Sequence, residues 1–129
     1  MKLLLDTHIW LWYLLDNPKL SNKLKTAIAD LNTELWLSPI SIWETLILAE
    51  KGRISLQPDP IAWINLALKI LETREAQINY AIAILSRQIS LPHQDPADRF
   101  IAASAIYYGL TLATVDANLT GNSALPTLS

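Results

Sequence analysis

The stretch HQDPADRFIAASAIYYGLTLATVD, residues 93–116, holds one complete helix-to-strand unit and decides the fold. Asp95 and Pro96 are typical of a helix start, because aspartate caps free backbone N–H groups and proline fits the first helical position. The apolar run that follows ends at Gly109, a residue type that commonly terminates helices. LTLAT, residues 110–114, then predicts a short strand. A helix joined directly to a strand indicates an α/β fold.

The N-terminal segment predicts the same two kinds of element. Lys2–Leu5 is an apolar run of strand length that ends at Asp6, and Ile9–Leu15 is apolar at nearly every position, as in a helix buried in a core. The remaining elements expected from the pattern are a helix carrying Leu20, Leu24, Ile28 and Leu31, a strand over 34–38, a helix capped by Ser41 and running to about Lys51, a helix from Pro60 carrying Ile61, Ile64, Leu68 and Leu71, and a helix over 97–108. AQINYAIAI, residues 76–84, fits a strand or a helix. The alternation predicts an α/β sandwich with a mostly parallel sheet.

Composition limits the class of protein. A chain of 129 residues predicts a single domain over 1–129. Cysteine is absent, so any metal must be held by oxygen or imidazole, and the composition is compatible with a reducing cytoplasm. The net charge of −2 argues against binding nucleic acid through the overall field. Asp6 and His8 interrupt the N-terminal apolar segment, which argues against a signal peptide, and no apolar run reaches the roughly 20 residues of a membrane span.

Four acidic residues stand next to strand ends or helix starts. They are Asp6 after the first strand, Glu44 and Asp98 in the first turns of two helices, and Asp116 after the last strand. The ligand crevice of an open parallel sheet lies outside the carboxyl ends of its strands, so we expect all four at one end of the domain. Each acid other than Asp6, taken alone, is explained by the helix dipole, and Glu44 also by a capping box with Ser41. Together, converging carboxylates raise their pKa values or recruit a cation, and their hard oxygens suit Mg²⁺ or Mn²⁺.

Four segments resemble the motif blocks of PIN-domain ribonucleases, and most of all those of the short VapC-type toxins of bacterial toxin–antitoxin pairs. The segments are LLLDTHIWLW at 3–12, LSPISIWETLILAEKGRI at 37–54, HQDPADRFIAASA at 93–105 and LATVDANL at 112–119. They are collinear and span almost the whole chain. The resemblance implies a PIN-like three-layer α/β/α sandwich whose mostly parallel central sheet has about four or five strands. It also selects Asp6, Glu44, Asp98 and Asp116 as ligands of Mg²⁺ or Mn²⁺.

The resemblance implies metal-assisted hydrolysis of an RNA phosphodiester bond. A bound metal activates water and neutralises charge on the scissile phosphate. Asp6 is the first expectation for a direct or bridging ligand and Asp98 the second, with Glu44 and Asp116 completing the ring or orienting water. The number of metal ions stays open. The resemblance further implies a homodimer and a small antitoxin protein that lies over the first helix and reaches the acidic site.

Six neighbouring residues are candidates for supporting roles. Asp95 is expected to cap the helix that follows rather than bind metal. His93 is expected on a loop, in a structural or rim role. Arg99 should point away from its neighbour Asp98, towards an intramolecular salt bridge or an RNA phosphate.

The other three supporting candidates are hydroxyl residues. Thr7, Ser41 and Thr114 are placed to hydrogen-bond carboxylates or metal-bound water, with helix capping and strand ends as the simpler explanation. His8 lies in the DTH pattern of the family and is expected to support the first helix.

Aromatic and basic residues indicate further surfaces. Trp36 and Trp43 sit in core-like patterns and are expected to pack inside, rather than to stack on RNA bases. Trp10, Trp12 and Tyr13 cover more than one face of the first helix, so part of that surface is expected to meet a partner. Five basic residues are interpreted either as a rim that binds RNA or simply as solvated side chains: Lys19, Lys23, Lys25, Lys51 and Arg53.

The sequence also departs from the family pattern. Leu48 stands where these toxins often carry a basic residue, and Gln94 and Ala97 replace an arginine and an aromatic residue. These changes affect expected RNA contacts and the grip on an antitoxin, and they remove no acid. Two alternatives are a catalytically silent PIN-like module that binds RNA or protein, and an aspartyl-nucleophile phosphatase. The phosphatase requires an aspartate where this chain has His8, and so fits poorly.

Overall fold

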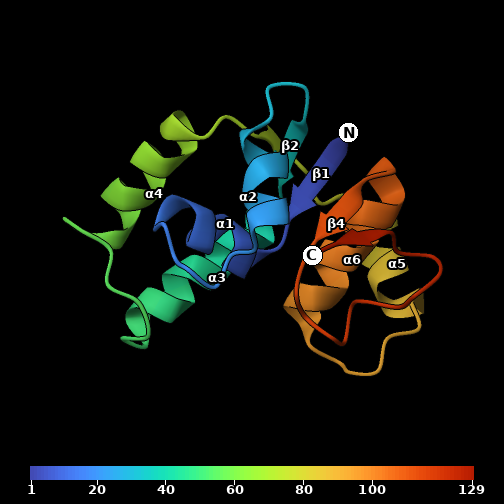
Figure 1. Cartoon of the computed structure of the whole chain (residues 1–129). Coiled ribbons are helices and arrows are strands. Elements are labelled where there is room, and N and C mark those ends of the chain that lie inside the picture. The colour runs from blue at the N-terminus through green and yellow to red at the C-terminus, as the bar shows by residue number, and fades with distance from the viewer.

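The computed structural model describes residues 1–129 and contains one sheet of five parallel strands between layers of helices (Figure 1). The strand order is β3-β2-β1-β4-β5, and every neighbouring pair is parallel. The strands are β1 (Lys2–Leu5), β2 (Glu34–Leu37), β3 (Arg74–Glu75), β4 (Thr111–Ala113) and β5 (Thr127–Leu128). The predicted α/β/α sandwich with a parallel sheet is confirmed.

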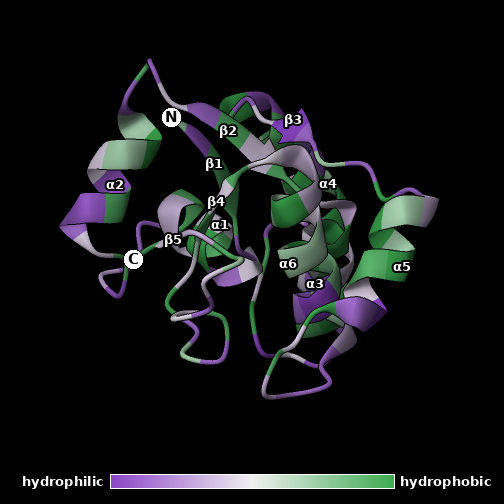
Figure 2. Cartoon of the chain, turned by 90° about the vertical axis from the view of Figure 1, so that its right-hand side faces the viewer, coloured by the Kyte–Doolittle hydropathy of each residue, from purple (hydrophilic) through white to green (hydrophobic).

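Six helices cover the sheet, and none is both long and apolar enough to cross a membrane. They are α1 (Thr7–Leu14), α2 (Asn22–Ala29), α3 (Pro39–Glu50), α4 (Pro60–Ile70), α5 (Tyr80–Gln88) and α6 (Pro96–Tyr108). In Figure 1, α1 and α4 lie on one side of the strands and α5 and α6 on the other. The ribbon of α2 alternates between hydrophilic and hydrophobic colour in Figure 2, because Leu24 and Ile28 face the core while the other face meets solvent.

Strand β1 divides the core into two clusters. Leu3 and Leu5 are buried with side chains of α1, α2 and α4, whereas Leu4 is buried with side chains of α5 and α6. Successive side chains of a strand point to opposite faces of a sheet, so a continuous apolar run is what a strand covered on both faces requires. The position of β1 in the middle of the sheet follows from this pattern.

The helix that was predicted from residues 93–116 is confirmed at both ends. The Asp95 side chain accepts hydrogen bonds from the backbone N–H groups of Ala97 and Asp98, at 3.0 and 3.4 Å, and Pro96 takes the first helical position. Gly109 ends α6 in the left-handed conformation, with φ of 66°, which costs glycine little because it has no Cβ. These two caps fix the first turn of α6, which carries Asp98.

The start of α3 corrects one prediction. Ser38, rather than Ser41, is the N-cap, and Pro39 occupies the first turn. Ser41 is therefore inside the helix and completely buried, and Glu44 stands in the second turn rather than in a capping box. The reason is that Ser38-Pro39 is a start signal of the same kind as Asp95-Pro96, and it comes earlier in the chain.

Three other features of the secondary structure differ from the sequence-based expectation or settle a choice that it left open. Helix α2 ends at Ala29, so Leu31 lies beyond it and is fully exposed. Asn79 caps α5, which makes most of the undecided stretch 76–84 helical. Strands β3 and β5 have two residues each, too short to give a periodic signal.

The sheet has a switch point between β1 and β4. From β1 the chain builds outward to β2 and β3, and then returns to add β4 on the other side of β1. Leu5 pairs with Ala113, and the Asp6 N–H donates to the Ala113 carbonyl at 3.0 Å. A switch point of this kind leaves a crevice at the carboxyl ends of the two strands, because the flanking helices lie on opposite faces.

Candidate metal centre

An acidic cavity of about 390 Å³ opens at the carboxyl ends of β1 and β4. The four predicted carboxylates line it together, although they come from the residue after β1, from α3, from α6 and from the segment after β4. The full lining is Asp6, His8, Ile9, Trp12, Glu44, Asp95, Asp98, Val115 and Asp116. No lysine or arginine is among these residues, and His8 is the one lining side chain that can carry a positive charge.

Asp6 is the most enclosed of the four acids, with 8% of its surface exposed. Its Oδ1 accepts a hydrogen bond from the Thr7 N–H at 2.8 Å, and its Oδ2 accepts one from the Thr114 hydroxyl at 2.7 Å. Burial raises the pKa of Asp6 above its ordinary value, although both hydrogen bonds act in the opposite direction. The carboxyl group is thus held in one orientation and is costly to ionise without a nearby cation.

Glu44 is held by two buried hydroxyl groups. Thr7 Oγ1 lies 2.5 Å from Glu44 Oε1 and 2.9 Å from Ser41 Oγ. Because the Thr7 hydroxyl has one proton, it donates to Glu44 and accepts from Ser41. Burial raises the pKa of Glu44, and the Thr7 hydrogen bond partly offsets this. This chain of hydroxyls fixes Glu44 of α3 relative to α1.

Asp98 lies against His93. The His93 Nε2 atom is 2.8 Å from Asp98 Oδ2, and ligand atoms of His93, Asp98 and Asp116 all lie within 4.8 Å of one another. Burial, together with the charges of nearby acids, raises the pKa of Asp98 to about 6, although the His93 hydrogen bond lowers it. His93 Nδ1 is buried without a hydrogen-bond partner. The only hydrogen-bond partner of the His93 ring is therefore Asp98.

Arg99 takes neither of the two roles that were predicted for it. It is buried, with 4% exposed, and has no carboxylate partner. Its guanidinium donates to the backbone carbonyls of Ser86, Ile89 and His93 at 2.7, 2.5 and 3.1 Å. The end of α5 and the loop after it turn these carbonyls inward, where a planar group with five donors can satisfy all three. Arg99 thereby fixes the loop that carries His93.

Replacing Arg99 by alanine is expected to lower the free energy of unfolding by about 3 kcal/mol, because three inward-facing carbonyls lose a charged donor. Arg99→Lys is expected to lose less, since an ammonium keeps the charge but not the planar fork. Urea unfolding measures both variants. Arg87→Ala is the control, because Arg87 is exposed and bonds only Gln94. An Arg99→Ala protein as stable as this control would contradict the assignment.

Asp95 and Asp116 are held by local backbone contacts. The Asp95 carboxylate is the cap of α6, as predicted, and it also lines the acidic cavity. Asp116 Oδ1 accepts from the Asn118 N–H at 2.9 Å, while the Asp116 N–H donates to Thr114 Oγ1 at 3.1 Å. The Thr114 hydroxyl therefore contacts both the Asp6 carboxylate and the Asp116 backbone N–H.

Several residues around the site were missed or misplaced by the sequence. His8 and Trp12 both line the acidic cavity, and their rings lie 6.0 Å apart. Their spacing of four residues on α1 was the available signal, since such residues share a helix face.

Trp43 was predicted to be in the core but is 54% exposed, and Trp36 is half-buried against Tyr108. Trp10 is completely buried.

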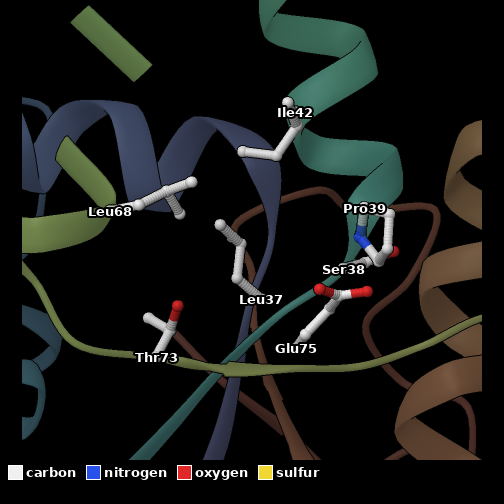
Figure 3. Close-up of a pocket in the computed structure, with 7 residues that line it drawn as sticks. All are labelled: Leu37, Ser38, Pro39, Ile42, Leu68, Thr73 and Glu75. Carbon is white, nitrogen blue, oxygen red and sulfur yellow. The ribbon is translucent and has the colours of Figure 1, made fainter. Parts of the chain in front are cut away.

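A second cavity, of about 420 Å³, lies at the carboxyl end of β2 and shares no residue with the acidic cavity (Figure 3). Leu37, Ile42 and Leu68 form its apolar wall, and Glu75 is its single carboxylate. One carboxylate does not make a divalent-metal site. The acidic cavity has the donor set that fits a hard divalent cation: a buried and two half-buried carboxylates whose pKa values are raised, with no lysine or arginine in the lining.

The chain is similar to known proteins in both sequence and structure. The sequence profile described as the PIN domain matches residues 3–122. Over 116 residues the chain is 34% identical to Ribonuclease VapC22 of Mycobacterium tuberculosis, which covers 90% of this chain and 88% of that protein. Among solved structures, VapBC2 from Rickettsia felis bound to a DNA fragment from their promoter gives a TM-score of 0.69 at 16% identity, covering 99% of this chain and 98% of that one. VapBC-1 from nontypeable Haemophilus influenzae gives 0.68 at 21% identity, covering 100% and 98%. At these identities the structural likeness concerns the fold.

Proposed function

The chain belongs to the PIN domain family, and from that premise we propose that it is a metal-dependent ribonuclease whose Asp6, Glu44, Asp98 and Asp116 bind Mg²⁺ or Mn²⁺. The observation that carries the proposal is the convergence of these four carboxylates, from distant parts of the chain, on one cavity without a lysine or arginine. The 34% identical relative is named a ribonuclease, which supports RNA as the substrate.

The metal supplies an activated water and neutralises charge on the scissile phosphate when it is bound. The chain's own residues hold the ligands in place beforehand. Thr7 and Thr114 fix the two oxygens of Asp6, the Ser41–Thr7 pair fixes Glu44, and His93 fixes Asp98. Hydrogen bonds of this kind reduce the reorganisation that metal binding requires, because the acids already point in defined directions.

We also propose that the protein works in the cytoplasm as the toxin of a toxin–antitoxin pair, as a homodimer that a small antitoxin holds inactive. The structural relatives are VapB–VapC pairs, which supports an antitoxin partner. Helix α4 supports a protein partner as well, since Leu66 and Ile70, which lie one turn apart on the same face of the helix, expose 56 and 69% of their surface. Apolar side chains gathered on one helix surface commonly mark protein interfaces.

Chelation of divalent metal is expected to reduce RNA cleavage to background, and excess Mg²⁺ or Mn²⁺ to restore it, because the carboxylates alone cannot activate water. The measurement is the initial rate of cleavage of structured and single-stranded RNAs by purified protein, in metal and in chelator. Calorimetric titration of the same protein with Mn²⁺ reports metal binding separately. Metal binding without cleavage of any RNA would favour the catalytically silent module instead.

A further inference from the structure

We propose that a groove over α3 binds the RNA strand on one side of the cleaved bond, with a base stacked on Trp43 and backbone phosphates on Lys51 and Arg53. This α3 groove has a volume of about 370 Å³ and includes these three residues. The inference rests on the proposed ribonuclease function and adds the path that the substrate takes away from the metal centre.

The α3 groove is continuous with the acidic cavity. His8, Glu44 and Asp95 line both, so no wall separates the two spaces. A strand whose scissile phosphate lies at the carboxylates must carry its neighbouring nucleotides along the surface next to the cavity. The shared residues make the α3 groove such a path.

Trp43 offers a free aromatic surface at the start of this path. It directly precedes Glu44 on α3 and is 54% exposed. The other tryptophan at the metal centre, Trp12, already lies against the His8 ring and under the Lys19 ammonium. Trp43 has no aromatic or cationic neighbour of this kind. An exposed indole next to a site for RNA chemistry is suited to stacking on a base, because every base has a π face.

Lys51 and Arg53 supply positive charge at the far end of the groove. Both are exposed, and neither forms an ion pair, whereas Lys25 pairs with Asp16. Gly52 between them adopts a φ of 69°, and this left-handed turn ends α3 with one cation on each side. Lys51, the C-cap of α3, lies seven positions after Glu44, or about 10 Å along the helix axis. The two cations therefore face phosphates beyond the scissile one.

Charge favours RNA over a protein as the occupant of the groove. A chain with a net charge of −2 and a cluster of carboxylates repels a polyanion, so substrate binding needs cations near the metal centre. The acidic cavity contains no lysine or arginine, whereas Lys51 and Arg53 in the adjoining groove form no ion pair. A second copy of the chain is the competing occupant, and the experiment separates it from RNA.

The test measures binding of a fluorescent single-stranded RNA of about twelve nucleotides to the full-length protein in chelator, so that cleavage does not contribute. The double variant Lys51→Ala/Arg53→Ala is expected to weaken binding about tenfold or more and to reduce the slope of log K against log salt by about two. Lys2→Ala/Lys69→Ala is the matched control with the same charge change, and it is expected to have little effect, because both lysines are exposed and neither lines the acidic cavity or the α3 groove. Thermal unfolding checks that each variant is folded.

Trp43 gives an independent readout. Trp43→Ala is expected to weaken RNA binding about tenfold with an unchanged salt slope, and Trp43→Phe to restore part of the loss. If the groove double variant and the control double variant lose the same RNA affinity, the proposal that the α3 groove binds RNA is contradicted, because binding would then depend only on overall charge. Loss of dimer in sedimentation without loss of RNA binding would assign the groove to a second copy and also overturn it. If the groove variants weaken RNA binding as expected but the wild-type protein cleaves no RNA, the proposed ribonuclease activity is contradicted and the RNA-binding groove is still supported.

Discussion

Asp98→Asn is expected to lower the rate of RNA cleavage by about a thousandfold and, at the same time, to stabilise the metal-free protein at neutral pH. The loss of activity follows from removing one of the four proposed charged ligands, since several kcal/mol of transition-state stabilisation by a bound metal correspond to about three powers of ten in rate. Asparagine has nearly the same shape as aspartate and keeps an oxygen that can accept from His93 Nε2. The change is therefore mainly one of charge.

The gain in stability follows from the raised pKa of Asp98. In the folded protein burial brings this pKa to about 6, against 3.8 for the free group, so the ionised form disfavours folding at neutral pH. A neutral amide removes that cost, which we expect to be about 1 to 2 kcal/mol after allowance for solvent screening. Thermal unfolding in chelator near neutral pH measures the gain.

Asp30→Asn is the matched control for this substitution. Asp30 is exposed at the end of α2, and its side chain accepts from the Asn32 N–H at 2.9 Å, a role that asparagine can keep. Cleavage and stability are both expected to stay close to those of the unmodified protein. Equal cleavage by wild type and Asp98→Asn would identify the activity as a contaminant, and a less stable Asp98→Asn protein would contradict the charge argument.

Divalent-metal binding is expected to weaken by at least about tenfold between pH 7.5 and pH 5, and cleavage to fall with it. Burial raises the pKa values of Asp6, Glu44 and Asp98, the last to about 6, and metal binds the ionised form. Protons therefore compete with the metal at a higher pH than at exposed carboxylates. With one such group the loss per pH unit below about 6 approaches tenfold, and further raised groups make it steeper.

The stability of the metal-free protein should change in the opposite direction. Between 3.8 and about 6 the folded state holds the Asp98 proton more tightly than the unfolded state does, so stability falls as pH rises through this window. Calorimetry with Mn²⁺ and thermal unfolding in chelator, each at several pH values, measure the two trends. The Asp98→Asn protein should show a shallower pH dependence in both. A metal affinity that is flat from pH 5 to about 7.5 would contradict the raised pKa values.

The features that the sequence predicted best are those written in local patterns. Asp95-Pro96 and Gly109 specify both ends of α6 through backbone hydrogen bonding and φ angles, which depend on the residues themselves. The grouping of the four acids needed one further rule, that the strands of a parallel sheet end at the same edge. The cavity they share follows from that rule, while their roles as ligands stay a prediction.

The features that the sequence did not predict depend on the third dimension. The partners of Arg99 are backbone carbonyls of a loop, which no side-chain pattern encodes. Helix α3 is apolar on most of its surface, so periodicity could not tell that Trp43 faces solvent. Ser38 and Ser41 are both reasonable caps, and the choice between them was set by Pro39 and by the buried contact of Ser41 with Thr7.

The way Arg99 holds its loop has a consequence for sequence drift. The guanidinium grips carbonyl oxygens, which every amino acid carries, so the loop keeps its path whatever side chains it displays. Pro92 and Gln94 are exposed and can change without disturbing that grip. The surface beside the four acids can therefore change its side chains without loss of the backbone that supports it, which leaves room there for altered target preference.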